Sequence, residues 1–337
     1  MKIPAIDVAP LFAGASAARD RTDAAIAEAA ADSGFMSIRN LPNAVAPTRQ
    51  MRARLLRLFS LDEANKRALW RKSFDPAGPA LYRGYFPLQS GVATYKEGID
   101  MGPDVAHSGW RADPSDPLTE ATPLPPEAAL PGWRDDIRAY YQGMEALGAA
   151  MMRSLARSLS LDEYLFAPAF RDGISTLRLI RYPERPESSF VGADPAKVFV
   201  EHDGQRRYVI GAAHVDSGFV TLLAQDGVPG LQAKSREGAW IDVPPAEGTM
   251  AVNFGGLLER WTGGRIKATE HRVLGPGRER FSIPFFYEPR VDAVIRPLPG
   301  GPDFTPFTYG DHLWAAMVKF VEFRAIADLR TPRGVPA

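Results

Sequence analysis

The sequence predicts a mainly β-sheet protein with flanking α-helices, arranged as a jelly roll. Two observations support this fold class. Residues 207–287 contain short runs rich in β-branched and aromatic side chains, separated by turns with Gly or Pro, as in sandwiches and jelly rolls. Residues 17–33 and 133–160 instead carry apolar side chains at intervals of three and four, which predicts helices that cover the sheets.

The first third of the chain mixes strand and helix signals. Short strands are expected at residues 3–8 and 34–38, on either side of the helix at 17–33. A second helix is expected over residues 47–71, where leucine and phenylalanine recur at helical spacing. We assign residues 1–105 to an N-terminal region of helices and strands.

Proline then interrupts the pattern. Residues 112–132 contain Asp-Pro and Pro-Pro pairs, which fit neither a helix interior nor a central strand. The loop and the helix at 133–160, which we expect to back the sheets, make up residues 106–173.

Strand signals dominate from residue 174. A first strand is expected at residues 174–182, an inner strand at 248–254, and an irregular polar segment at 183–204 between them. Residues 311–329 predict an amphipathic closing helix. We therefore divide this part into a jelly-roll core, residues 174–290, and a C-terminal helical segment, residues 291–337.

Composition narrows the class of function. The 337 residues include 40 Lys+Arg and 40 Asp+Glu, so no charge excess favours nucleic acid or a membrane surface as partner. There is no cysteine, which excludes disulfides and thiolate metal sites. The start of the chain lacks the apolar core of a signal peptide, and no apolar run is long enough to span a bilayer. We expect a cytoplasmic monomer or weak homo-oligomer that acts on a small molecule.

One motif contains residue types that bind metal ions. A strand through Val215 would place His214 and Asp216 on one face, and His271 follows several strands later. Two imidazoles and a carboxylate form a three-ligand site for Fe(II), Mn(II) or Zn(II) with positions left open. An isolated His-x-Asp is often accidental, but here Arg280-x-Ser282 follows His271 at short range, and the combination is much more specific.

This region resembles the C-terminal core of the iron(II)- and 2-oxoglutarate-dependent dioxygenases, in the branch that contains isopenicillin N synthase. The runs that match are residues 213–223, 230–233, 240–243, 261–273 and 280–286. The resemblance implies a distorted double-stranded β-helix, with His214, Asp216 and His271 as iron ligands. It also implies that Arg280 and Ser282 hold the far carboxylate of 2-oxoglutarate.

The resemblance also suggests roles for other residues. Tyr182, before Pro183, would help to hold the 2-oxoglutarate carboxylate, unless it is only a barrel tyrosine bonded to nearby backbone. The expected reaction is the hydroxylation or other oxidation of a C–H bond of a small polar metabolite, with O₂ consumed and succinate and CO₂ released. Ser217 follows Asp216 where thymine hydroxylases of this branch carry an aromatic residue, so thymine is not the expected substrate.

Candidates for substrate contact are less specific. Arg178 shares a strand face with Tyr182, although a salt bridge at the barrel rim is the favoured explanation for it. Phe219 and Phe286 would line the pocket, although some of the phenylalanines must belong to the core. Arg83, together with Tyr85 and Lys96, lies in segments that resemble those over the barrel mouth; alternatively, Arg83 and Glu97 only tie that region together.

Three alternative functions remain from the sequence. An iron oxidase of the isopenicillin N synthase type would keep the same motif without consuming 2-oxoglutarate. A non-catalytic metal- or ligand-binding sensor would keep the barrel without turnover. A hydrolytic zinc enzyme is disfavoured because no carboxylate is placed as a general base.

Overall fold

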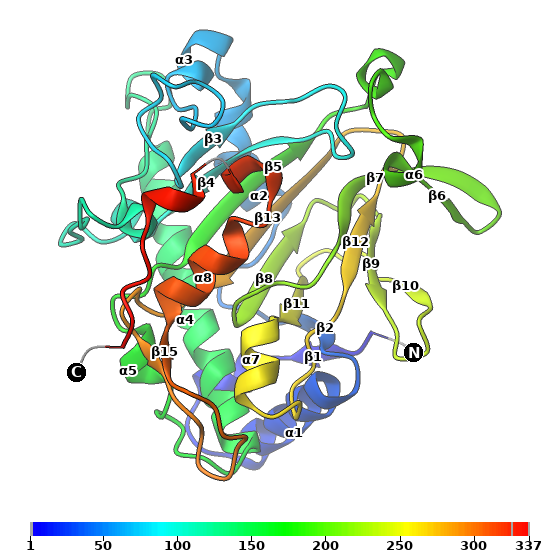
Figure 1. The fold of residues 1–337 in the computed structure, drawn as a ribbon. Helices are drawn as coiled ribbons and strands as arrows, with labels where there is room; N and C mark the ends of the chain where they lie inside the picture. The colour runs from blue at the N-terminus through cyan, green and yellow to red at the C-terminus, as the bar shows by residue number, and fades with distance from the viewer. Residues whose placement is uncertain (1–2, 325, 336–337) are drawn as a thin grey trace.

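The computed structural model describes residues 3–324 and 326–335. Two β-sheets face each other and helices lie around them (Figure 1). The larger sheet has the strand order β1-β2-β11-β8-β13-β5-β4-β3, and the smaller has the order β10-β9-β12-β7-β6. The predicted class, mainly β with curled sheets and flanking helices, is confirmed. None of the helices in these ranges combines the length and apolar character needed to cross a membrane.

The larger sheet joins strands from distant parts of the chain. All its pairs are antiparallel except β1 with β2. Four of its strands come from the predicted N-terminal region and four from the predicted core. Their bounds are β1 Ala5–Asp7, β2 Phe35–Arg39, β3 Gly84–Phe86, β4 Glu97–Met101, β5 Thr176–Tyr182, β8 Val220–Gln225, β11 Met250–Phe254 and β13 Arg280–Tyr287.

The smaller sheet is antiparallel throughout. Its strands are β6 Phe199–His202, β7 Gln205–His214, β9 Leu231–Lys234, β10 Trp240–Asp242 and β12 His271–Leu274. Between β12 and β7 the register shifts twice, once between His271 and Val273 and again before Leu274. Such bulges bend a strand and redirect its side chains, and these two lie beside the candidate metal ligands. A further small pair joins β14 Val294–Ile295 and β15 Phe307–Thr308.

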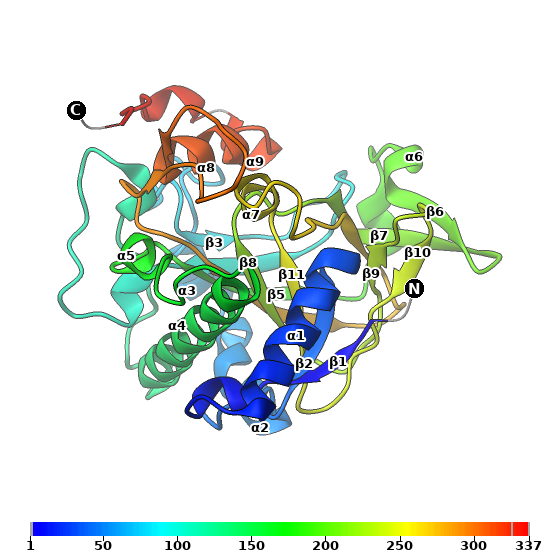
Figure 2. The same ribbon diagram turned by 90° about the horizontal axis from the view of Figure 1, so that it is seen from below.

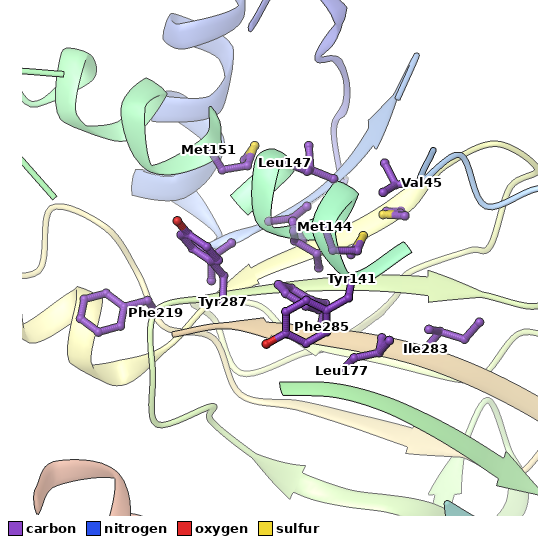
Figure 3. Close-up of a cluster of buried hydrophobic side chains, with 14 of the residues drawn as sticks. Val45, Tyr141, Met144, Leu147, Met151, Leu177, Phe219, Ile283, Phe285 and Tyr287 are labelled. Atoms are coloured by element: carbon purple, nitrogen blue, oxygen red, sulfur yellow. The ribbon is translucent and has the colours of Figure 1, made fainter. Parts of the chain in front are cut away.

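Helices α1 (Ala17–Asp32) and α4 (Trp133–Ser158) confirm the two helices expected there. They run side by side against the outer face of the larger sheet (Figure 2). The apolar stripe of α4, which includes Tyr141, Met144 and Leu147, packs on Leu177 and Phe285 of the sheet (Figure 3). Each such buried side chain contributes about 1.5–3 kcal/mol, so this contact fixes the larger sheet in place.

Two predicted helices are divided in the structure. The expected helix at 47–71 is α2 (Arg49–Leu55), a 3₁₀ helix (Leu56–Ser60) and α3 (Glu63–Arg67), which begins because Asp62 accepts a hydrogen bond from the Asn65 amide.

The expected closing helix is likewise divided. Its parts are α8 (Tyr309–Met317), α9 (Val321–Arg324) and a 3₁₀ helix (Ala327–Leu329). The apolar spacing continues across these breaks, so spacing alone could not locate them.

Two strand boundaries also differ from the prediction. Strand β6 lies inside residues 183–204, which we expected to be irregular, and it forms a hairpin with β7. The turn is Asp203-Gly204, both with positive φ (51° and 69°), as a tight hairpin requires. Strand β7 ends at His214, so the strand predicted to run through Val215 is wrong there, and Asp216 lies in the following loop.

Candidate metal centre

Three potential metal ligands converge between the sheets. His214 ends β7 and His271 begins β12, and the two residues face each other directly in the antiparallel register. Asp216, in the loop after β7, brings Oδ1 to 3.4 Å from His214 Nε2 and 3.9 Å from His271 Nε2. One ligand atom from each residue lies within 4.8 Å of the others. The loop, not a continuous strand, therefore brings the carboxylate to the histidines.

Backbone carbonyls fix the orientation of both imidazole rings. His214 Nδ1 lies 2.8 Å from the carbonyl oxygen of Ala212, and His271 Nδ1 lies 3.1 Å from that of Thr269. A carbonyl only accepts hydrogen bonds, so Nδ1 carries the proton in each ring. The Nε2 lone pairs are then left for a cation, and both are directed toward Asp216.

Two polar side chains of the larger sheet hold Asp216. Its Oδ2 accepts hydrogen bonds from Thr221 Oγ1 at 2.6 Å and from Asn253 Nδ2 at 2.7 Å. This leaves Oδ1 toward the histidines. Burial acts to raise the pKa of Asp216, but the nearby imidazoles and the hydrogen bond from Thr221 outweigh it and hold the pKa well below its usual range. The carboxylate is therefore ionised, as a metal ligand must be.

The pKa values of the two histidines are shifted in opposite directions. Burial lowers the pKa of His271, so this imidazole is neutral at pH 7. Burial also acts to lower the pKa of His214, but the bond to Asp216 prevails and the net shift is upward. The positive charge of Lys96 opposes that upward shift of the His214 pKa. A divalent cation would replace the proton that Asp216 favours on His214.

The loop that carries Asp216 packs tightly on the start of α7 (Gly256–Trp261). The Gly256 amide donates to the carbonyl of Asp216 at 2.7 Å. A Cβ atom on Gly255 would lie only 2.3 Å from the carbonyl oxygen of Gly218, so a larger residue does not fit at Gly255. His312 Nε2, from α8, donates to the carbonyl of Ser217 at 2.9 Å. Gly255 is the N-cap of α7 and Gly256 is its first residue, so the pair leads directly into the helix beside the three ligands.

A buried guanidinium lies on the inner face of the larger sheet. Arg280 is 0% exposed and pairs across the sheet with Tyr182, whose ring centroid lies 5.4 Å from Arg280 Cζ. Among the described residues Arg280 has no ion-pair partner and its Nη1 has no hydrogen-bond partner, while Nη2 reaches Gln225 only at 3.4 Å. Ser282 is two residues further on the same face. Burial lowers the pKa of Arg280, but an arginine still keeps its charge.

These residues fit a bound carboxylate. A buried cation without a counter-ion is costly, and a carboxylate would satisfy the unpaired Nη1 and neutralise the charge. Arg280, Ser282 and Tyr182 are thus brought together, as the sequence indicated. Their assignment to 2-oxoglutarate stays a prediction, as does the assignment of the three metal ligands to iron.

The predicted substrate residues lie in different surroundings. Arg178 donates to Asp100, with Nη2 and Oδ2 2.8 Å apart, and its Cζ lies 5.4 Å from the ring centroid of Phe286. Asp100 also forms an ion pair with Arg71. Burial acts to raise the pKa of Asp100, but the two arginines lower it to about 2. The salt bridge that we considered for Arg178 is therefore present, and contact with substrate stays a prediction for Arg178 and Phe286.

Arg83 and Phe219 are buried more deeply. Arg83 is 0% exposed and donates to Thr176 Oγ1 at 2.6 Å and to the carbonyl of Ile174 at 2.9 Å. Phe219 packs edge-on against Phe170 and Trp261 in the main core and is 2% exposed. Both environments favour a structural role, so for these residues too the substrate role stays a prediction.

Tyr85 lies on the opposite face of the larger sheet from the candidate centre. Its hydroxyl donates to Glu97, which also binds Arg181 and Lys66. Glu97 therefore belongs to an ion-pair cluster that holds β4, as the alternative interpretation of this region proposed.

The sequence analysis overlooked Thr221, Asn253 and Gln225. The first two orient Asp216, and the third is the nearest side-chain acceptor to Arg280. A signal was present in Asn253, because it is a polar residue inside the otherwise apolar run of β11, and a buried amide needs a partner.

Comparisons with known proteins agree with this geometry. Residues 175–289 match the model of the 2OG-Fe(II) oxygenase superfamily, and residues 3–126 match that of the N-terminal region of non-haem dioxygenases in morphine synthesis. The chain is 30% identical over 320 residues to isopenicillin N synthase of Streptomyces clavuligerus, covering 92% of this chain and 93% of that protein.

Two further matches extend the comparison. The chain is 30% identical over 333 residues to the 2-oxoglutarate-Fe(II) type oxidoreductase hxnY of Emericella nidulans, covering 91% of this chain and 87% of that protein. The crystal structure of a full-length Neurospora crassa protein in complex with alpha-KG and thymine superposes with a TM-score of 0.76 at 26% identity, over 94% of this chain and 97% of that chain.

Proposed function

Because this chain belongs to the 2OG-Fe(II) oxygenase superfamily, we propose that it oxidises a C–H bond of a small polar metabolite and converts 2-oxoglutarate and O₂ to succinate and CO₂. The observation that carries the proposal is the convergence of His214, Asp216 and His271 beside the buried Arg280, whose Nη1 is unpaired.

In this proposal the chain holds Fe(II) through His214 Nε2, His271 Nε2 and Asp216 Oδ1. Three ligands from one side leave the other side open for the co-substrate and O₂. The backbone bonds at Nδ1 and the bonds from Thr221 and Asn253 set the three donors before the metal binds. When bound, Fe(II) and 2-oxoglutarate supply the oxidising chemistry that amino-acid side chains lack.

The grip on the co-substrate would come from the larger sheet. The guanidinium of Arg280 would donate to the far carboxylate of 2-oxoglutarate, and the hydroxyl groups of Ser282 and Tyr182 would add donors from the same face. This end of the pocket is apolar otherwise, because Ile180, Phe86 and Ile210 pack around Tyr182. A dry environment strengthens each charged hydrogen bond.

The primary substrate would lie on the remaining side of the metal. The predicted substrate residues are Arg178, Arg83, Phe219 and Phe286. Thymine, which is bound in the Neurospora crassa crystal structure, is not the predicted substrate of this chain. A screen of metabolites for 2-oxoglutarate-dependent succinate release, with thymine included, tests this part.

An anaerobic titration tests the proposal directly. Fe(II) with 2-oxoglutarate should give a visible charge-transfer band in the wild-type protein, and Asp216→Ala should give none. Arg280→Met should need about a hundredfold more 2-oxoglutarate, because two charged hydrogen bonds are lost. The matched control Arg181→Met removes a guanidinium from the opposite face of the same strand pair and should titrate like wild type. A wild-type band in Asp216→Ala would refute the proposed ligand set.

A second candidate is an iron oxidase that does not consume 2-oxoglutarate. The identity to isopenicillin N synthase favours it, since that relative shares nearly the whole length of the chain. Substrate-dependent O₂ consumption without succinate would support this candidate. A sensor without turnover would bind Fe(II) and ligand yet consume neither O₂ nor 2-oxoglutarate with any substrate.

A further inference from the structure

The loop between β3 and β4, residues 87–96, leaves the larger sheet and reaches over the open end of the two sheets (Figure 1). It meets the segment that leads from β5 to β6, where the Gly91 amide donates to the carbonyl of Ser189 at 3.0 Å. Because the candidate metal ligands lie between the sheets, this loop forms part of the approach to them.

Arg185 ties the loop down. Its guanidinium donates to the carbonyls of Val92 at 2.7 Å and Ala93 at 2.8 Å, and to Ser189 Oγ at 3.0 Å. The side chain is 7% exposed and lies over the ring of Phe190, 4.3 Å from its centroid. A buried arginine with this many backbone acceptors holds two loops in one arrangement, so the end of the loop at residue 96 is fixed in space.

Strand alternation directs Lys96 toward the inner face. Its neighbour Glu97 pairs with Arg181 and contacts Lys66 and Tyr85 on the outer face. Lys96 directly precedes β4, and because successive side chains point to opposite faces, its side chain is directed to the inner face, next to the position of Tyr182 in β5.

The ammonium of Lys96 is half-buried and has no ion pair or hydrogen bond among the described residues. Other acids on this face are already engaged. Asp100 binds Arg71 and Arg178, Asp216 belongs to the metal centre, and Glu288 accepts hydrogen bonds from Thr176 and Tyr309. On the same inner face, Phe86, Ile180 and Tyr182 form an apolar cluster with Ile210 of the smaller sheet. An anion from outside the chain is thus the partner that the ammonium lacks.

We propose that Lys96 binds a carboxylate group of the primary substrate at the entrance to the metal centre. The inference rests on the proposed oxygenase function and adds one chemical feature to its substrate. The same ammonium could in principle meet the co-substrate carboxylate, but Arg280, Ser282 and Tyr182 already offer that group a complete set of donors. We therefore assign Lys96 to the substrate, with an apolar body expected next to the charge.

Binding can be measured without turnover. The protein is loaded with Zn(II), which has no redox chemistry, and saturated with 2-oxoglutarate so that the Arg280 site is filled. Ligand-observed NMR then compares phenylacetate with phenylacetamide and hexanoate with hexanamide. Wild-type protein should bind at least one carboxylate roughly ten- to hundredfold more tightly than its amide, the worth of a charged hydrogen bond. Equal affinities in both pairs, or no binding of either carboxylate, would overturn the proposal.

Variants assign the preference to one side chain. Lys96→Met should abolish the preference for the acid, and Lys96→Arg should retain it. Lys72→Met, at an exposed site away from the loop, should behave like wild type. A preference that persists in Lys96→Met contradicts the assignment.

A measurement of 2-oxoglutarate binding separates this inference from the proposed function. In the anaerobic Fe(II) titration, Lys96→Met should bind 2-oxoglutarate like wild type. A tenfold loss of affinity for 2-oxoglutarate would show that Lys96 binds the co-substrate, and would overturn the assignment to the primary substrate. If wild type shows no Fe(II)–2-oxoglutarate band yet prefers acids through Lys96, the oxygenase function fails and the anion site stands. If wild type shows a normal Fe(II)–2-oxoglutarate band but no preference for carboxylates over amides, the oxygenase function stands and the Lys96 anion site fails.

Discussion

The two sheets of this molecule contribute to the site in different ways. The larger sheet is covered by α1 and α4, and every residue of its strands β4 and β11 is buried. The smaller sheet contains exposed residues in β6, β7 and β10, and its register shifts twice beside the site. Yet two of the three candidate metal ligands belong to the smaller sheet, and the side chain of His214 is 40% exposed.

The difference shows how an open sheet can hold a defined metal geometry. The carboxylate that completes the site is held by Thr221 and Asn253 from the buried sheet, not by its own loop alone. The larger sheet thus acts as a scaffold for stability and for orientation, and the smaller sheet leaves the metal accessible. Substitutions in the two regions should therefore separate stability from function.

The largest effect is expected in the core of the larger sheet. Phe285 is 0% exposed and packs edge-on against Tyr141 with ring centroids 5.0 Å apart. Phe285→Ala should lower the free energy of unfolding by about 3–5 kcal/mol, measured by urea denaturation. Phe199→Ala, in β6 of the smaller sheet, is the matched control and should cost much less. Similar losses in both variants would remove the distinction between the sheets.

A smaller effect, on metal affinity, is expected from the contact between the regions. Thr221→Val keeps the shape of the side chain but removes the hydrogen bond to Asp216 Oδ2. Fe(II) affinity should fall by roughly 10- to 100-fold, as for other groups that orient a metal ligand. The unfolding midpoint of the metal-free protein should change little by comparison. Wild-type affinity would mean that the Thr221 hydrogen bond is not needed to position the carboxylate.

The buried charge on the larger sheet should appear in the pH dependence of stability. Burial raises the pKa of Glu288 to about 7 from its ordinary 4.5. The folded state therefore binds the proton more tightly, and this stabilisation is complete below about pH 4.5 and is lost as the pH rises through about 7. In the wild type, the unfolding free energy should therefore fall by on the order of 1–2 kcal/mol between pH 5 and 8. Glu288→Gln should not show this fall, as measured by thermal unfolding at each pH. The exposed control Glu28→Gln should leave the profile unchanged.

The smallest effect is expected on the outer side of the smaller sheet. The ring of Trp240, in the edge strand β10, lies 4.1 Å from the Cζ of the buried Arg272. Trp240→Ala should cost about 0.5–1 kcal/mol of unfolding free energy and leave Fe(II) and 2-oxoglutarate binding unchanged. Binding measured in the anaerobic titration checks the second point, and weaker binding would show that this edge also supports the metal centre.

The sequence predicted the site more completely than the chain path around it. Side-chain chemistry marked His214, Asp216, His271 and Arg280, because few residue types bind metals or carboxylates and their spacing is legible. The end of β7 at His214 was harder to locate, since Val215 and the run that begins at Phe219 favour a strand, although Asp216, Ser217 and Gly218 between them are turn residues.

Other features depended on contacts that spacing does not encode. The hairpin at Asp203-Gly204 carried a local turn signal that we overlooked. The bond from Asn253 to Asp216 joins residues that are 37 positions apart in the sequence, so only the assembled sheet brings these two groups together.

The close approach of Gly218 and Gly255 has a practical consequence for engineering. A side chain cannot be added at Gly255 without moving the loop that carries Asp216. Substitution there would therefore disturb the candidate metal centre, whatever its effect on selectivity. Randomised libraries intended to change which compounds are accepted should leave this junction intact. They should instead sample residues 87–96 and leave out Gly91, whose positive φ and close approach to the carbonyl of Val191 disfavour a side chain.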